Sequence, residues 1–224
     1  MLKNKKRGSL VIISGTTCAG KGTVIKELLK RNPNLSLSIS YTSRNIRLGD
    51  IPDVTYHFVS NEEFEKKIQN DDFLEYAKVH DNYYGTPKKE IEEKLKSGLD
   101  VILEIEVQGA KIVKEKLPET ILIFVMAPSM EEVKRRIIAR GAETKEQIIR
   151  RFQTAYQEIN EIPKYNYVVV NDEVENAVKK IEAILISEKC RVDRIEEISV
   201  ENQEEVLHEL LMDKKFNNDI KEIK

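Results

Sequence analysis

The segment Gly15-Thr16-Thr17-Cys18-Ala19-Gly20-Lys21 constrains the fold of this chain more than any other feature. Its Gly-x-x-x-x-Gly-Lys spacing is that of a phosphate-binding loop (P-loop), in which backbone N–H groups converge on an anion and the lysine reaches the β- and γ-phosphates. A β-branched apolar run at 9–14 precedes the loop, and apolar residues at helical spacing follow it up to Pro33. Because strand, loop and helix come in the required order, a nucleotide-phosphate site is favoured over a glycine-rich turn with a surface lysine.

The residues after this loop predict a place for Mg²⁺. The motif usually has Ser or Thr directly after the lysine, but here Gly22 stands there and Thr23 follows, a known variant among nucleotide kinases, so Thr23 is the candidate metal hydroxyl. Glu104 and Glu106 are two residues apart at the end of the apolar run 101–106 and therefore project to one face. Unpaired carboxylates are costly to bury. They are expected to face Mg²⁺, its waters or a substrate, unless the strand simply emerges into solvent.

Apolar runs and helical patterns alternate through most of the chain, which indicates an α/β fold with a parallel, doubly wound sheet flanked by helices. Residues 34–98 break this alternation with Ser/Thr-rich, tyrosine-rich segments. We expect them to form a mixed α/β insertion over the carboxyl ends of the strands, where ligands bind. The expected strands are 9–14, 101–106, 120–125 and 167–170, and the expected helices are 60–70, 87–97, 108–116, 129–140, 145–160 and 174–188.

The predicted organisation is thus a core of residues 1–33 and 99–190, the insertion, and an acidic helical extension at 191–224, with residues 1–7 as a frayed basic arm. The composition, 40% apolar and 34% charged in 224 residues, excludes disorder and a membrane protein. The net charge of −2 is too small to suggest nucleic-acid binding. Two cysteines without disulfide or metal spacing favour a reducing cytoplasm.

Basic residues gather in two places, although surface arginines are usually only solvated. Arg44 and Arg47 lie in the insertion, whereas Arg136 and Arg140 are four residues apart beside Gly141 and so share a helix face. That arrangement predicts a small lid, approximately 136–151, which brings guanidinium groups onto transferring phosphates.

Several segments together resemble the guanylate kinase family over about residues 9–189. The family transfers the γ-phosphoryl group of ATP to GMP with Mg²⁺, and the resemblance implies this activity and ATP, GMP and dGMP as partners. The matching segments are 40–49, 56–59, 73–77, 82–85, 103–109, 140–141 and 170–172.

The resemblance also assigns roles to residues. The family's acceptor is a phosphate that is already ionised, so no general base is expected, and positioning with charge neutralisation carries the reaction. The expected catalytic residues are Lys21, Arg44, Arg136, Arg140 and Arg151. The resemblance implies that Arg44, Arg47, Tyr56 and Tyr84 bind the GMP phosphate, that Ser40, Glu75 and Thr86 read guanine, that Glu104 and Glu106 lie by the metal and GMP, and that Arg140 and Asn171 lie by ATP.

Glu75 gives the base preference a physical reason. Guanine presents N1–H and N2–H₂ side by side, so a carboxylate accepts twice, whereas adenine presents a bare N1 acceptor. On the residues alone, Glu75 could equally be a surface-facing strand residue.

Four departures from the family pattern stand in the sequence: Cys18 for a loop glycine, Asp50 for glutamate, Glu106 for aspartate, and 51–55 without an Asn-Gly turn. Two alternatives remain open, a kinase for another nucleoside monophosphate and a guanylate-kinase-like protein-binding module. The sequence leaves open whether the protein is a monomer or a homo-oligomer.

Overall fold

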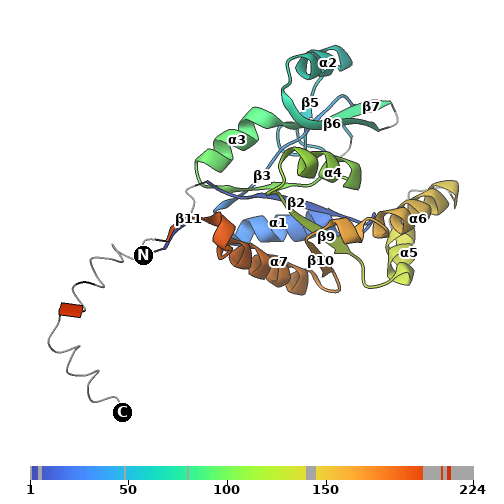
Figure 1. The fold of residues 1–224 in the computed structure, drawn as a ribbon. Helices are drawn as coiled ribbons and strands as arrows, with labels where there is room; N and C mark the ends of the chain where they lie inside the picture. The colour runs from blue at the N-terminus through green and yellow to red at the C-terminus, as the bar shows by residue number, and fades with distance from the viewer. Residues whose placement is uncertain are drawn as a thin grey trace. The chain divides into compact units, whose positions relative to one another are not determined.

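A five-stranded parallel sheet forms the centre of the fold (Figure 1). The computed structural model describes residues 2–4, 7–47, 49–79, 81–139, 145–198, 208, 211 and 212. The parallel pairing confirms the predicted α/β class. In spatial order the strands are β10 (Tyr167–Val170), β9 (Ile121–Met126), β2 (Leu10–Gly15), β8 (Asp100–Leu103) and β3 (Leu35–Leu37).

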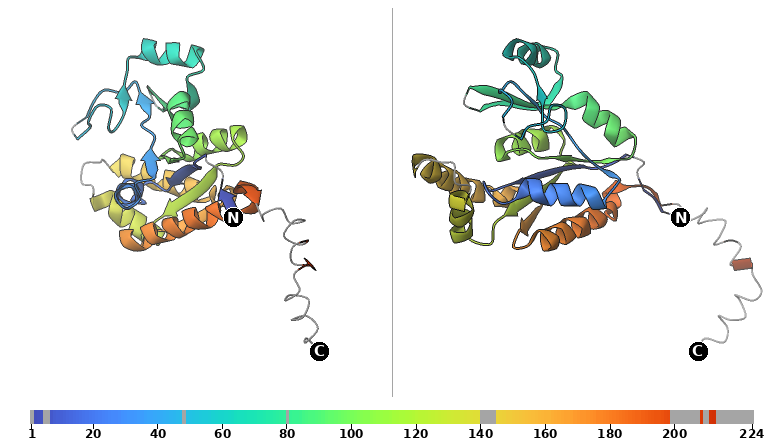
Figure 2. Two further views of the ribbon diagram at one scale, coloured as in Figure 1. Left: turned by 90° about the vertical axis from the view of Figure 1, so that its left-hand side faces the viewer. Right: turned by 180° about the vertical axis from the view of Figure 1, so that it is seen from behind.

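Helices cover both faces of this sheet (Figures 1 and 2). One face carries α1 (Lys21–Arg31) and residues 174–183 of α7 (Val174–Lys189), and the other carries α3 (Lys88–Lys96) and α4 (Val107–Lys116). Side chains alternate along a strand, so Leu10 and Ile12 pack with α3 and α4 while Val11 and Ile13 face the opposite side. All four side chains are buried, which accounts for the continuous apolar run of β2.

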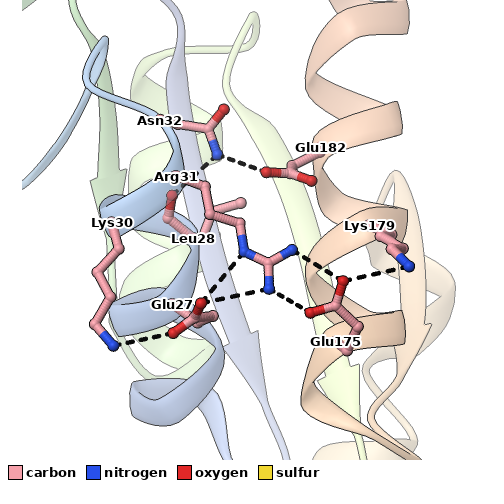
Figure 3. A network of polar contacts seen from close by, with 8 residues as sticks. All are labelled: Glu27, Leu28, Lys30, Arg31, Asn32, Glu175, Lys179 and Glu182. Carbon is pink, nitrogen blue, oxygen red and sulfur yellow. Dashed lines mark hydrogen bonds and ion pairs between the residues drawn. The ribbon is translucent and has the colours of Figure 1, made fainter.

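A polar network joins the end of α1 to α7 (Figure 3). The Arg31 guanidinium donates to Glu27 on its own helix and, at 3.1 Å, to Glu175 on α7. The Asn32 amide donates to Glu182 at 2.8 Å. Because exposed ion pairs contribute little stability, this network serves mainly to align the two helices beside each other.

The insertion has its own sheet, on the α3 and α4 side of the core (Figure 2). Phe64 of α2 (Asn61–Gln69) stacks on Phe73 and Tyr83, with centroids 4.5 and 5.1 Å apart, and so anchors the helix to that sheet. β3 and α3 lie within the predicted insertion, residues 34–98, but they pack with the core. The strands, in spatial order, are β5 (His57–Phe58), β4 (Tyr41–Thr42), β7 (Asn82–Pro87) and β6 (Phe73–Val79).

The predicted lid lies where α5 (Met130–Ala139) meets α6 (Lys145–Ile159), and α6 leads into the 3₁₀ turn η1 (Ile162–Lys164). Val133, Ile137 and Ala155 form a small apolar cluster between the two helices. The turn between the helices, with the predicted site residue Arg140, lies outside the described residues.

The two ends of the chain pair with each other: β1 (Leu2–Asn4) runs antiparallel to β11 (Ile195–Ile198), which follows the 3₁₀ turn η2 (Val192–Arg194). The frayed arm predicted for residues 1–7 is therefore wrong for β1. The extension predicted to be helical starts with a 3₁₀ turn and a strand, and its described residues 208, 211 and 212 are helical. Pairing between distant segments leaves no local sequence pattern, so neither strand was foreseen. In the described part of the chain, no helix has the length and apolarity needed to cross a membrane.

Gly15, at the end of β2, has a φ of 151°, and a Cβ there would lie 1.8 Å from the Val125 carbonyl oxygen. We predict that Gly15→Ala lowers the free energy of unfolding by about 3 kcal/mol or more, because strain and a backbone clash add. Gly49→Ala is the matched control, since Gly49 also has a positive φ, 93°, but open space around it, and should cost about 1 kcal/mol. Urea unfolding measures both, and equal costs would contradict the packing described.

Candidate active site

The loop after β2 is folded as an anion receptor. The Thr16 N–H donates to the Val125 carbonyl at 3.2 Å, and the Ala19 N–H to the Thr16 carbonyl at 3.1 Å. The unpaired N–H groups lie in the loop and the first turn of α1, where the helix end is also positive. No described residue accepts a hydrogen bond from the N–H groups of Cys18, Gly20, Lys21, Gly22 and Thr23.

Lys21 lies against this loop. Its Nζ donates to the carbonyls of Gly15 at 2.8 Å and Thr16 at 3.4 Å. The ammonium group is thus held by neutral acceptors of the loop itself, which leaves its charge available to an incoming phosphate.

Arg136 and Asn171 hold the outer side of the loop. The Asn171 amide is buried and donates to the Ala19 carbonyl at 2.6 Å, while its backbone carbonyl accepts from Arg136 at 3.1 Å. Arg136 also reaches the carbonyls of Ala19 and Cys18, at 3.3 and 3.5 Å. Both predicted residues therefore stand at the loop, but with their polar atoms engaged in supporting its backbone.

Two carboxylates follow β8 at the carboxyl edge of the sheet. β8 ends at Leu103, so Glu104 and Glu106 lie just beyond the strand rather than within it, and both are solvent-exposed. The Glu104 carboxylate is 3.8 Å from the place where a Cβ on Gly22 would stand. The surrounding protein removes part of the water around the Glu104 carboxylate and so raises its pKa, although the charge of Lys21 opposes this and that of Glu106 adds to it.

These residues fit a magnesium ion. Glu104 lies beside the first turn of α1, on which Thr23 is exposed, so carboxylate and hydroxyl oxygens are available at one place. Mg²⁺ prefers oxygen ligands and is commonly held by one or two carboxylates together with waters and substrate phosphates. No group of three or more His, Cys, Asp or Glu side chains in the described segments has a metal-binding arrangement of its own.

Glu158, in the last turn of α6, is a site residue that the sequence analysis missed. Its carboxylate accepts a hydrogen bond of 2.9 Å from the Thr17 N–H, across 141 residues of chain. Burial raises the pKa of Glu158 to about 7, against the opposing effect of the Thr17 N–H, and the charge of Glu106 adds to the rise. Glu158 follows Arg151 by seven residues and hence shares its helix face, the one signal that points to it.

The insertion brings a second group of predicted residues together around Arg44. This guanidinium is buried and makes a forked contact with Asp50, at 2.7 and 3.2 Å, and Asp50 also accepts from the Arg47 N–H at 2.7 Å. Arg44 lies 5.2 Å from the ring centroid of Tyr56, and the rings of Tyr56 and Tyr84 are 5.9 Å apart. Asp50 therefore reaches Arg44 although its side chain is shorter than that of the glutamate usual in the family. The hydrogen bond between the two lowers the pKa of Asp50.

Glu75 is a buried carboxylate paired with a buried hydroxyl. The Thr86 hydroxyl donates to Glu75, and burial raises the pKa of Glu75 against this hydrogen bond. Gly109 on α4 makes room for the carboxylate, because a Cβ there would lie 2.9 Å from it. Ser40 is half-buried directly before β4. The alternative of a surface-facing Glu75 is thereby ruled out.

Comparison with known proteins places this arrangement in a family. The family model for guanylate kinase matches residues 7–188. The chain is 54% identical over 212 residues to a guanylate kinase of Clostridium perfringens, covering 95% of this chain and 98% of that one. It is 55% identical over 208 residues to that of Clostridium tetani, covering 93% and 100%. The crystal structure of guanylate kinase from Anaplasma phagocytophilum matches with a TM-score of 0.72 at 31% identity, over 92% of this chain and 96% of that one. The chain belongs to the guanylate kinase family.

Proposed function

We propose that this protein transfers the γ-phosphoryl group of ATP to GMP, giving ADP and GDP. The observation that supports this most is the buried Glu75–Thr86 pair, which lies in the same molecule as a loop with unpaired N–H groups. Burying a carboxylate is costly unless hydrogen bonds compensate for the lost water, and a ligand that donates to Glu75 would supply further hydrogen bonds.

On the donor side, the loop and Lys21 bind the β- and γ-phosphates of ATP. When bound with ATP, Mg²⁺ neutralises charge on the phosphoryl oxygens, and we propose Thr23 and Glu104 as the residues that hold it. We further propose that residues 136–151 form a lid, with Arg151 and Arg140 reaching the phosphates. Arg136 is proposed to act mainly by holding the loop carbonyls in place.

On the acceptor side, Arg44 and Arg47 bind the phosphate of GMP together with the hydroxyls of Tyr56 and Tyr84. Asp50 occupies the Arg44 fork in the structure and thereby keeps it oriented. The phosphate oxygen that attacks is ionised near neutral pH, so the residues need only align it with the γ-phosphorus and offset the charge. We propose the cytoplasm, where purine nucleotides are interconverted, as the compartment.

Glu75 supplies the choice of base. Its carboxylate accepts from N1–H and N2–H₂ of guanine, while Thr86 and Ser40 hold the remaining polar edge. Adenine places an acceptor opposite this carboxylate, and two acceptors left unpaired in a buried site are strongly disfavoured.

A coupled assay of ADP formation with GMP, dGMP, AMP and UMP as acceptors tests the proposed activity. We expect kcat/KM for GMP to exceed that for AMP by about 10³-fold or more, because a site built on polar pairing rejects the base that leaves its groups unpaired. Absence of transfer to GMP, or a clear preference for AMP, would disprove the proposal.

Glu75→Gln tests the base-reading role directly. Replacing one acceptor oxygen by an NH₂ donor sets two donors against each other, so we expect kcat/KM for GMP to fall about 100-fold or more, with the KM for ATP little changed. Glu92→Gln on the exposed face of α3 is the control and should match the wild type. Retention of GMP activity within about threefold by Glu75→Gln would contradict the assignment.

A further inference from the structure

The last turn of α6 makes a polar contact with the phosphate loop that the proposed roles leave unexplained. Glu158 accepts from the Thr17 N–H at 2.9 Å. Its place is unfavourable in two respects: the carboxylate is partly buried, and it lies one residue from the end of α6 at Ile159, where the helix end is itself negative. Such a residue does not improve the helix, so the hydrogen bond from the loop, together with the charge of Lys21, compensates for its unfavourable place.

Glu158 does not occupy the anion receptor. The N–H groups that have no acceptor among the described residues are those of Cys18 and of residues 20–23, whereas Thr17 stands just before them. The preceding N–H, that of Thr16, is bonded to Val125. Glu158 therefore accepts from the last N–H before the unpaired ones. Thr17 thus lies between the part of the loop whose N–H groups are bonded and the part that can bind an anion.

The contact stabilises a conformation that needs support. Cys18 follows Thr17 and has a φ of 58°, the left-handed region that a residue with a Cβ adopts at a cost of about 1 kcal/mol or more. An acceptor on the Thr17 N–H holds the neighbouring peptide in the orientation that this turn requires. The Arg136 guanidinium also supports this turn, because it donates to the Cys18 carbonyl at 3.5 Å.

The same contact orients α6. Arg151 precedes Glu158 by seven residues, close to two full turns, and therefore lies on the same helix face roughly 10 Å along the axis. When Glu158 is fixed to the loop, the Arg151 side of α6 is turned toward the loop as well. One hydrogen bond thus couples the shape of the phosphate loop to the direction of the arginine helix.

We propose that Glu158 is a positioning residue for ATP binding, which acts as a hydrogen-bond acceptor for the Thr17 N–H and so fixes both the loop and the Arg151 face of α6. This inference rests on the proposed function. It differs from an inhibitory role, in which Glu158 would compete with the phosphates and its removal would tighten ATP binding.

Calorimetric titration of ATP and Mg²⁺ into the protein without GMP is the test. We expect Glu158→Ala to weaken ATP binding about tenfold or more, because the hydrogen bond that fixes the loop is lost. Glu158→Gln keeps an acceptor oxygen of the same reach and should stay within about threefold of the wild type. Gln157→Ala, an exposed neighbour in the same turn, is the matched control and should bind like the wild type.

Steady-state kinetics supply the second readout: Glu158→Ala should raise the KM for ATP but leave the KM for GMP within about twofold. Unchanged or tighter ATP binding by Glu158→Ala, or equal weakening in Glu158→Gln, would overturn the proposal. Should Glu158→Ala not fold by circular dichroism, Glu158→Asp, whose shorter side chain does not reach Thr17, carries the same expectations. A wild type that binds no ATP would refute the proposed function instead.

Discussion

The loop between β2 and α1 depends on one constraint: a set of backbone N–H groups must remain unpaired while other backbone groups of the loop are held by hydrogen bonds. Unpaired N–H groups are costly in a folded protein, and hydrogen bonds to the neighbouring carbonyls and N–H groups hold the loop in the conformation that retains them. Val125 and Thr16 accept from the base of the loop, Asn171 and Arg136 bond its outer carbonyls, and Lys21 crosses it. The anion receptor is therefore preformed before any nucleotide arrives.

The electrostatics of the site are unusual for a receptor of anions, because three glutamates lie close to the loop. The pKa values of Glu104 and Glu158 are both raised, chiefly by burial, while Lys21 opposes the rise in each case. An exposed carboxylate beside α1 suits a divalent cation that arrives with the nucleotide. A partly buried carboxylate that accepts from a loop N–H suits a structural task, so the two glutamates differ in role because their surroundings differ.

Local patterns in the sequence were sufficient for the core of the fold. The buried run of β2, the glycines of the loop and the alternation of strands with helices predicted the parallel sheet, and 167–170 matches β10 residue for residue. The resemblance to guanylate kinases predicted that Glu75 and Thr86 lie close together, since both were expected to read guanine. In the structure the Thr86 hydroxyl donates to Glu75.

Contacts between distant segments could not be predicted in the same way. The hydrogen bond from Thr17 to Glu158 spans 141 residues, and the pairing of β1 with β11 joins the two ends of the chain. Neither contact produces a periodic pattern in the sequence, because each involves only one or a few residues from each of the two segments. The partner of the Asn171 amide could not be predicted for a related reason: an amide can bond a ligand or a backbone carbonyl, and only the fold shows that it donates to Ala19.

Binding of ATP to the wild type and to Lys21→Ala, measured by calorimetry, tests most directly whether this loop is a nucleotide receptor. We expect measurable binding by the wild type and a loss of about 30-fold or more in the variant, since a charge-assisted contact to the phosphates is removed. Lys26→Ala, an exposed lysine on the same helix, should bind like the wild type. Equal affinity in the wild type and Lys21→Ala, or no binding by either, would show that the loop is not a nucleotide receptor.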